Sequence, residues 1–440
     1  MIGINPRRVY TFLLWLLFPY TFLHLLWRAR RQPEYLNHIG ERFGFYPNNR
    51  ESESSQKPVI WLHTVSVGET RAAASLIQRL RQQYPSHQLL LSHTTPTGRD
   101  AGKQLYGDDV LRVYLPYDYP FAVQRFLRHY RPCIGILLET EIWFNLIHAS
   151  QAEKIPLLLL NARLSEKSAR GYARFPKLIQ TGLTELSLIA AQTEADAVRL
   201  TALGAENVAV MGNLKFDIEA PLAMLERGQH MRIQFGTGRK IFLAASTRTG
   251  EELLLLSMLK HVDIPNLLAV IVPRHPQRFD EVAALLTAHG VRFQRRSANC
   301  AIAPDTQILL GDNMGEMFAY YAACDIAFIG GSLLPFGGQN LIEASAVGKP
   351  VLIGPHTYNF EQASRLAVES GAAIRVQNAQ ELGLTLTTLF KQPERMEKLG
   401  RAGRDFVNAH RGATEKALLH ISQFIKPLSS KITQSHQSKN

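Results

Sequence analysis

The sequence predicts an α/β protein built from two doubly wound parallel sheets in tandem. Short, continuous apolar runs alternate with helical patterns along most of the 440 residues. Such runs are typical of strands that are covered on both faces. The length exceeds what one hydrophobic core usually serves. A polar segment beginning at Gly212 and Asn213 interrupts the series of strands. We therefore expect two domains that join near this segment.

The first domain begins with a buried strand at residues 59–62, which is followed by small residues up to Gly68 and by a helix from near Glu69. A strand, a glycine turn and a helix N-terminus form the opening unit of a doubly wound sheet. Further strands are expected at residues 89–92, 113–115, 134–138, 157–160, 188–191 and 208–211. The second domain is expected to use residues 241–245, 268–272, 308–310, 326–329, 351–353 and 373–376 as strands.

Composition narrows the class of partner. The chain is 46% apolar and 20% charged, as in ordinary globular proteins. It has 49 basic and 37 acidic residues, a net charge of +12, which favours an anionic partner. No basic block is interleaved with aromatic residues, so nucleic acid is a weaker candidate than anionic lipid or a phosphorylated small molecule. Cys133, Cys300 and Cys324 show neither metal-ligand spacing nor a disulfide framework, which favours a reducing compartment.

Residues 9–27 form an almost uncharged run near the minimum length for crossing a bilayer, interrupted by Pro19 and His24. We expect residues 1–32 to be a membrane anchor. Arg28, Arg30 and Arg31 follow the run and favour a cytosolic body. A helix lying in the headgroup region and a buried core helix are the alternatives.

Three groups in the first domain are candidates for catalysis. Glu69 lies on the first helical turn after the opening strand, where it either complements the helix dipole or faces a ligand. Glu139 and Glu141 follow the strand at residues 134–138 and are read as a helix cap, a catalytic pair or, less favourably, a metal pair. Lys215 lies where the two halves meet. A basic loop, Asn161-Ala162-Arg163-Leu164-Ser165 with Arg170 and Arg174 beyond, suits acceptor phosphates or a solvated face.

In the second domain, polar or glycine-bearing loops follow four strands. These loops are Pro273-Arg274-His275-Pro276, Gly311 to Glu316, Gly330-Gly331-Ser332 leading to Gln339-Asn340-Leu341-Ile342-Glu343, and Gly354-Pro355-His356. Glycines at strand ends let the backbone approach a ligand, and a helix N-terminus offers N–H groups to phosphate. Four such loops on one sheet edge predict a nucleotide site, in which Glu343 has two oxygens suited to ribose hydroxyls.

Taken together, these motifs resemble the 3-deoxy-D-manno-octulosonic acid (Kdo) transferases of Gram-negative lipopolysaccharide synthesis. The matching stretches are His63-Thr64-Val65-Ser66-Val67-Gly68-Glu69, Thr95-Pro96-Thr97-Gly98, Tyr114-Leu115-Pro116-Tyr117-Asp118, Glu139-Thr140-Glu141-Ile142-Trp143, Asn161-Ala162-Arg163-Leu164-Ser165, Leu214-Lys215-Phe216-Asp217, Pro273-Arg274-His275-Pro276 and Met314-Gly315-Glu316. The match runs over nearly the whole chain. Phe144, Gln339 and Leu341 depart from the family pattern, which has proline, histidine and proline there.

The resemblance implies two Rossmann-like domains of the GT-B glycosyltransferase type behind an N-terminal membrane-anchor helix. We therefore divide the chain into an anchor (residues 1–32), an acceptor-binding domain (33–215) and a CMP-Kdo-binding domain (216–427). The polar composition of residues 428–440 predicts a disordered tail. The resemblance further implies metal-independent transfer of Kdo with inversion, from CMP-Kdo to an anionic lipid A precursor, without a cofactor or an obligate protein partner. The enzyme is expected on the bacterial inner membrane with its catalytic body facing the cytoplasm.

The resemblance also assigns roles to residues of this chain. Glu69 is expected to be the general base, and Glu139 and Lys215 to stabilise the transition state. The donor-binding residues are expected to be Pro273, Arg274, Met314, Gly315, Glu316, Asn340, Leu341, Ile342 and Glu343. Two alternatives remain: a UDP-sugar-dependent glycosyltransferase or epimerase with the same fold, and a membrane-tethered nucleotide-binding protein without catalysis.

Overall fold

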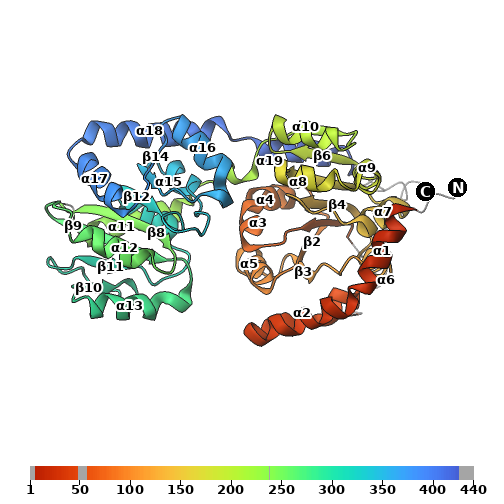
Figure 1. Cartoon of the computed structure of the whole chain (residues 1–440), viewed down its shortest axis with the longest axis horizontal. Coiled ribbons are helices and arrows are strands. Elements are labelled where there is room, and N and C mark those ends of the chain that lie inside the picture. Colours follow the sequence, from red (N-terminus) through yellow and green to blue (C-terminus); the bar gives the residue numbers. More distant parts are fainter. Residues whose placement is uncertain (1–4, 48–56, 237, 426–440) are drawn as a thin grey trace, which may run out of the picture. The chain divides into compact units, whose positions relative to one another are not determined.

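The computed structural model describes residues 5–47, 57–236 and 238–425. The tail predicted to be disordered, residues 428–440, lies outside them. The chain divides into two compact units (Figure 1). Unit 1 holds the described residues of Met1–Asp217 and Arg411–Asn440, and unit 2 those of Ile218–His410.

The described part of unit 1 forms a seven-stranded parallel sheet in the order β3-β2-β1-β4-β5-β6-β7. The strands are β1 (Val59–His63), β2 (Gln88–His93), β3 (Leu111–Tyr114), β4 (Pro132–Leu138), β5 (Leu157–Ala162), β6 (Leu188–Ala191) and β7 (Val208–Val210). Its helices are α1 (Pro6–Leu16), α2 (Phe18–Arg31), α3 (Val67–Ala72), α4 (Ala74–Gln83), α5 (Pro96–Tyr106), α6 (Pro120–Tyr130), α7 (Phe144–Ala152), α8 (Glu166–Tyr172), α9 (Pro176–Thr184), α10 (Glu194–Ala202) and α19 (Ala413–Ser422). Every strand predicted for this half is confirmed to within two residues at each end.

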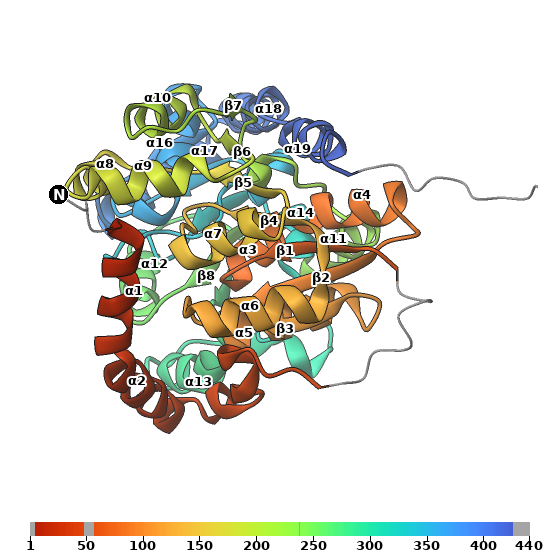
Figure 2. The same cartoon turned by 90° about the vertical axis from the view of Figure 1, so that its right-hand side faces the viewer.

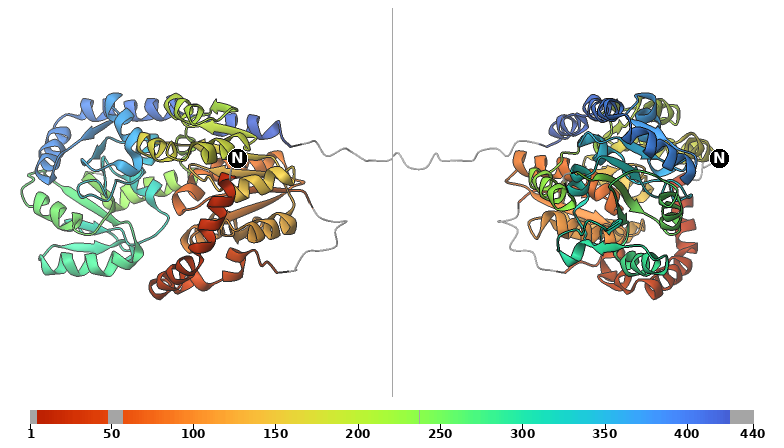
Figure 3. Two further views of the ribbon diagram at one scale, coloured as in Figure 1. Left: turned by 45° about the vertical axis from the view of Figure 1, so that its right-hand side comes forward. Right: turned by 90° about the vertical axis from the view of Figure 1, so that its left-hand side faces the viewer.

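The described part of unit 2 repeats the architecture, in the order β10-β11-β9-β8-β12-β13-β14. The strands are β8 (Lys240–Thr247), β9 (Leu267–Pro273), β10 (Phe293–Arg295), β11 (Ile308–Leu310), β12 (Ile326–Ile329), β13 (Val351–Ile353) and β14 (Ala373–Arg375). Its helices are α11 (Leu222–Phe235), α12 (Glu251–Leu259), α13 (Phe279–Ala288), α14 (Met317–Ala323), α15 (Ile342–Ala346), α16 (Glu361–Glu369), α17 (Ala379–Phe390) and α18 (Pro393–Ala409). In both units, helices lie on the two faces of the sheet (Figure 3). The sequence did not predict β10, because this edge strand has three half-buried residues and no apolar run.

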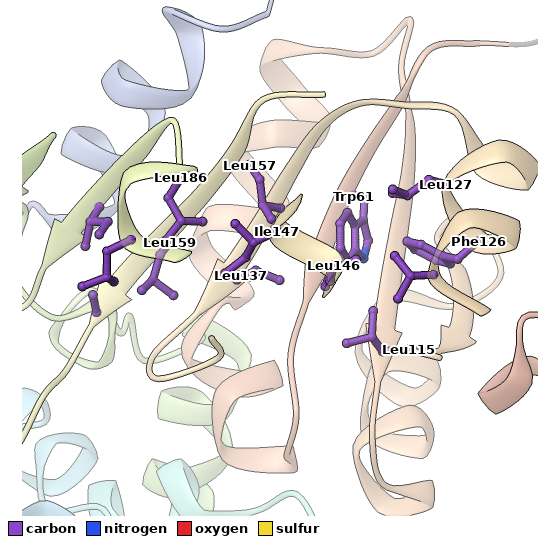
Figure 4. Close-up of a cluster of buried hydrophobic side chains, with 14 of the residues drawn as sticks. Trp61, Leu115, Phe126, Leu127, Leu137, Leu146, Ile147, Leu157, Leu159 and Leu186 are labelled. Carbon is purple, nitrogen blue, oxygen red and sulfur yellow. The ribbon is translucent and has the colours of Figure 1, made fainter. Parts of the chain in front are cut away.

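The core of unit 1 shows why its strands read as continuous apolar runs. All five residues of β1 are buried, so neither face carries polar side chains to solvent. Trp61 packs edge-on against Phe126 of α6, with ring centroids 4.9 Å apart (Figure 4). A Cβ atom on Gly135 of the neighbouring β4 would lie 2.7 Å from the Trp61 ring. Glycine is therefore required there, because any side chain would collide with the indole.

The predicted membrane anchor consists of two helices joined at a bend, whereas the sequence predicts a single helix. α1 and α2 meet at Leu17 with a bend of 51°. Pro19 lies in the first turn of α2, where its missing N–H and its ring interrupt a continuous helix. Among the described residues, neither helix alone has the length and apolar character of a membrane span, but the pair has both.

Polar side chains attach α1 to the rest of unit 1. The Tyr10 hydroxyl donates to Asp118 (2.9 Å) and the Thr11 hydroxyl to Asn145 (2.9 Å). Tyr10 also packs edge-on against Phe144, with ring centroids 5.0 Å apart. Figure 2 shows α1 beside α7, the helix that carries Asn145.

The C-terminal helix α19 lies in a different unit from the one that the predicted domain boundary gives it. Residues 216–427 were expected in the second domain, yet the described residues from Arg411 to Ile425 belong to unit 1. Leu418 and Ile421 of α19 pack into the core beneath β1 and β4. The Asp217 carboxylate accepts hydrogen bonds from Gly412 N–H (2.7 Å) and Thr414 N–H, at the start of α19. α19 belongs to unit 1 because its apolar face is buried in the core of that unit. The sequence shows that the helix has an apolar face, but it does not show which sheet that face packs against.

Strand order identifies where a ligand would bind in each unit. Strand order reverses between β1 and β4 in unit 1 and between β8 and β12 in unit 2. Ligands of doubly wound sheets bind beyond the carboxyl ends of the strands at this point. The loops to inspect are therefore those after β1 and β4, and those after β8 and β12.

Candidate active site

Glu69 is held at the mouth of the β1 loop by the first turn of α3. Ser66 is the N-cap, and its hydroxyl oxygen accepts the Glu69 N–H (3.4 Å). The Glu69 Oε2 atom accepts the Val65 N–H (2.7 Å). These contacts form a variant of a capping box. The helix-cap interpretation of Glu69 is therefore correct as geometry, but it leaves the carboxylate open to further roles.

Burial raises the pKa of Glu69 into the range that suits a general base. Desolvation raises the pKa of its carboxyl group from the ordinary 4.5 to about 7, against the lowering effect of the Val65 N–H. The negative charges of Glu139 and Glu141 contribute to this rise. A carboxyl group poised near neutral pH suits proton abstraction, because it is substantially ionised and still basic.

Glu139 and Lys215 form an ion pair at the carboxyl ends of β4 and β7. The Lys215 ammonium lies 2.8 Å from the Glu139 Oε1 atom, and each side chain is about one fifth exposed. Glu139 has a left-handed backbone with φ of +61°. Non-glycine residues adopt this conformation at a cost of about 1–3 kcal/mol, and they concentrate at functional sites. The Glu139 side chain thus meets Lys215 from a strained backbone position at the strand end.

Asn161 at the end of β5 positions the loop that carries Lys215. Its φ is also left-handed, at +54°. Its Oδ1 atom accepts the Leu214 N–H (3.1 Å), and the neighbouring Asn213 accepts the Lys215 N–H (3.0 Å). Of the basic loop predicted for acceptor phosphates, Asn161 is thus buried and structural, while Arg170 and Arg174 are exposed.

Glu141 points to different partners from Glu139. Its Oε2 atom accepts the Trp143 indole N–H (2.7 Å) and lies 3.8 Å from Nε2 of the buried His63. Within the described ranges, no group of three or more His, Cys, Asp or Glu side chains is placed to hold a metal ion. The two carboxylates are therefore arranged as separate pairs.

In unit 2, the loops after β9 and β12 meet through Arg274. Its Nε atom donates to the Gln339 side-chain oxygen (3.1 Å). Arg274 also acts on the hydroxyl of Tyr321, lowering the pKa that burial and Glu343 raise. The Arg274 N–H is bonded to the Thr247 carbonyl at the end of β8 (3.0 Å). The structure thus joins two predicted donor loops, those after β9 and β12, through Arg274, and ties them to the end of β8.

Glu251 organises the glycine loop after β12. This carboxylate is fully buried. Its oxygens accept the N–H groups of Gly331 (2.6 Å), Leu333 (3.0 Å) and Arg248 (2.9 Å). Sequence reasoning missed Glu251, because an acidic residue directly after a glycine reads as a helix cap.

The remaining predicted donor residues divide into two groups. The Glu343 Oε1 atom accepts the Asn340 side-chain N–H (3.2 Å), while Leu341 and Ile342 are buried, so they can approach a ligand through their backbone. Glu316 is buried and ion-paired with Arg227 and with Arg296 (3.5 Å). Met314 and Gly315 are exposed, and Pro273 ends β9 in a buried position.

The fold and the comparisons with known proteins first define the class of protein to which the chain belongs. The fold, with its two doubly wound sheets and loops at both points of strand reversal, is of the GT-B type. A family model described as "Glycosyl transferases group 1" matches residues 254–406. The UDP-GlcNAc 2-epimerase of Neisseria meningitidis matches with a TM-score of 0.58 over 83% of this chain and 100% of its own; at 18% identity it shows the fold alone.

The family model described as "3-Deoxy-D-manno-octulosonic-acid transferase (kdotransferase)" matches residues 37–218. The 3-deoxy-D-manno-octulosonic acid transferase of Bordetella pertussis is 40% identical, covering 94% of this chain and 98% of the relative. That of Haemophilus influenzae is 37% identical, over 96% and 99%. The chain belongs to the Kdo transferase family and is a glycosyltransferase of lipopolysaccharide core synthesis.

Proposed function

We propose that this enzyme transfers Kdo from CMP-Kdo to a lipid A precursor by direct displacement with inversion, with Glu69 as general base. One observation carries the proposal: at the strand-reversal edge of unit 1, burial raises the pKa of Glu69 to about 7. An acceptor hydroxyl is a poor nucleophile at neutral pH, and a positioned carboxylate that removes its proton contributes about 10²- to 10⁴-fold in rate.

Glu139 and Lys215 would stabilise charge as the donor bond breaks. Positive charge then develops on the sugar and negative charge on the departing CMP phosphate. The ion pair at 2.8 Å supplies one group of each sign in a fixed arrangement, so little reorganisation is needed during the reaction. Arg274, held by Gln339, would bind the phosphate of CMP with the other predicted donor residues of unit 2.

Charge on this phosphate would be met without a metal ion. Guanidinium, ammonium and helix N–H groups provide the positive charge in this scheme. The enzyme therefore has no need of a cofactor beyond its donor substrate.

The helix pair α1 and α2 would attach the enzyme to the inner membrane by lying in the headgroup region. α1 cannot cross a bilayer while Tyr10 and Thr11 are bonded to Asp118 and Asn145. The exposed apolar side chains of the pair include Phe12 (62% exposed), Leu16 (61%) and Leu23 (63%). Burying such side chains at a membrane interface, with cationic residues nearby, gives stable peripheral attachment. The catalytic body would face the cytoplasm, as the arginines after the apolar run favour.

The test of the base is Glu69→Gln, which keeps the size and an acceptor oxygen but removes the ionisable group. We expect a folded variant that binds CMP normally and transfers Kdo at least about a hundredfold more slowly in single turnover. Glu381→Gln is the matched control. Glu381 caps α17 in the same way, accepting the Gln377 N–H (2.8 Å) and donating its own N–H to Asn378 (2.9 Å).

A capping role alone predicts a different pattern. Both variants would then lose roughly 0.3–1 kcal/mol of stability with turnover nearly intact. Near-normal transfer by Glu69→Gln would remove Glu69 as the base.

A further inference from the structure

Glu141 has no assigned role of its own in the function proposed above, although it follows β4 only two residues after Glu139. The side chain is 18% exposed. Its Oε2 atom accepts the Trp143 indole N–H at 2.7 Å. An indole N–H is a donor only, so this bond fixes an acceptor at Glu141.

The second neighbour of Glu141 is the buried imidazole of His63. The His63 side chain is fully buried, and its Nδ1 atom lies 3.0 Å from the Ser92 carbonyl oxygen and 2.9 Å from the Ser92 hydroxyl. Its Nε2 atom has no hydrogen-bond partner among the described residues, and it faces Glu141 at 3.8 Å. A buried polar atom without a hydrogen-bond partner costs free energy, so its presence in the structure calls for an explanation.

His63 and Glu69 belong to the same short segment, which links Glu141 to the base. His63 ends β1, and Val65, two residues later, donates its N–H to Glu69. β1 and β4 are adjacent and in register, with His63 beside Leu137, so the segments after both strands emerge side by side. The negative charge of Glu141 accordingly acts on Glu69, and it also acts on Tyr172 of α8.

We propose that Glu141, fixed by Trp143 and faced by the buried His63, is a positioning residue that tunes the general base Glu69 through space. This inference rests on the proposed role of Glu69. The charged and titratable groups to consider are Glu139 and Glu141, which act on Glu69, together with Lys215 paired with Glu139, and His63 on β1 and Tyr172 on α8, which neighbour Glu141. Glu141 keeps the Glu69 carboxylate basic, because a nearby negative charge disfavours a second one.

The direct experiment is a titration of Glu69 itself in the full-length protein. With glutamate labelled by ¹³C at the carboxyl carbon, the Glu69 NMR signal is assigned by its loss in Glu69→Gln. We expect Glu141→Gln to lower the midpoint of the Glu69 titration by about one pH unit, as for two carboxylates at a partly buried site. The acidic limb of the pH–rate profile should shift in the same direction. The transfer rate above this limb should fall about threefold, because the base is weaker, while the KM for the donor stays unchanged.

Glu185→Gln is the matched control. Glu185 also pairs with a histidine, His148, at 2.9 Å, and its side chain is 13% exposed. It is absent from the groups that act on Glu69. The control changes the net charge equally, so it should leave the Glu69 midpoint in place.

Trp143→Phe provides a second test if Glu141→Gln fails to fold. It removes the N–H donor but keeps an aromatic ring, so a smaller shift in the same direction is expected. An unmoved Glu69 midpoint in the folded variants would overturn the proposal, as would an equal shift in Glu185→Gln. Failure of the base assignment is recognised separately, by near-normal transfer in Glu69→Gln.

Discussion

At the residue scale, one carboxyl group performs two tasks. Glu69 caps α3 through the Val65 N–H, and the same bond holds the side chain where burial raises its pKa. A cap on the surface would stay acidic, since water would stabilise its charge. Here the capping geometry fixes the orientation of the proposed base, and desolvation raises its pKa.

The raised pKa of Glu69 predicts opposite pH trends for activity and for stability. The folded state retains a proton that the unfolded chain releases above about pH 4.5, so the free energy of unfolding should fall as pH rises from there to about 7. Transfer should instead increase as pH passes through about 7, because the base must be ionised. Chemical unfolding and single-turnover assays over pH 4–9 measure both. Glu69→Gln should flatten both trends, and retention of either would assign it to another group.

Arg274 yields a prediction about the donor. Arg274→Ala should weaken CMP binding roughly 10- to 100-fold, the range expected on losing hydrogen bonds to a charged group. Arg274→Lys should recover part of the loss, because lysine lacks the planar fork. Arg365→Ala, which breaks an exposed pair with Glu369 on α16, is the control. Isothermal titration with CMP measures the affinities, and wild-type affinity in Arg274→Ala would exclude it from the site.

At the element scale, α1 and α2 show how packing changes the meaning of an apolar run. Phe144 stands where the family pattern has proline. Its ring packs against Tyr10 of α1 and against Gly182 of α9, where a Cβ atom would lie 2.7 Å from the Phe144 ring. Leu25 and Ala29 of α2 are buried with Tyr35. The run thus covers unit 1 on one side and leaves other apolar side chains exposed.

Membrane attachment through this exposed side is testable without deleting the helices. Leu16→Glu combined with Leu23→Glu should reduce binding to anionic phospholipid vesicles at least about tenfold, since burial of each leucine contributes about 1.5–3 kcal/mol. Leu419→Glu on α19 alters an equally exposed leucine (63%) and should not affect binding. Vesicle flotation gives the comparison. Unchanged flotation of the double variant would place the attachment elsewhere.

At the scale of the whole molecule, the same architecture is used twice with different chemistry. Carboxylates occupy the strand-reversal edge of unit 1, and glycine loops around a guanidinium group occupy that of unit 2. The net charge of +12 matches two anionic substrates.

This division of labour predicts that transfer is independent of divalent metal. The rate should be unchanged in excess EDTA, because basic side chains and N–H groups take up the phosphate charge. Assays with EDTA, and with EDTA followed by magnesium, measure this. A rate that collapses with the chelator and returns with magnesium would restore the metal-pair interpretation of Glu139 and Glu141.

The sequence by itself determined the two tandem sheets, because strands covered on both faces must be apolar along their whole length. It also located the loops at the strand ends, since glycines and polar residues interrupt those runs. The roles of Glu69, Glu139, Lys215 and the donor residues stay predictions, although the structure places the first three at one sheet edge.

Only the tertiary structure decided which distant groups meet. Lys215 pairs with Glu139 across 76 residues of sequence, and His63 faces Glu141 across two neighbouring strands. The return of α19 to unit 1 and the docking of α1 on Asp118 and Asn145 are of the same kind. Local patterns report whether a side chain is to be buried, because burial depends on its own polarity. They do not report its partner, because that depends on strand order and on how the chain closes around the sheet.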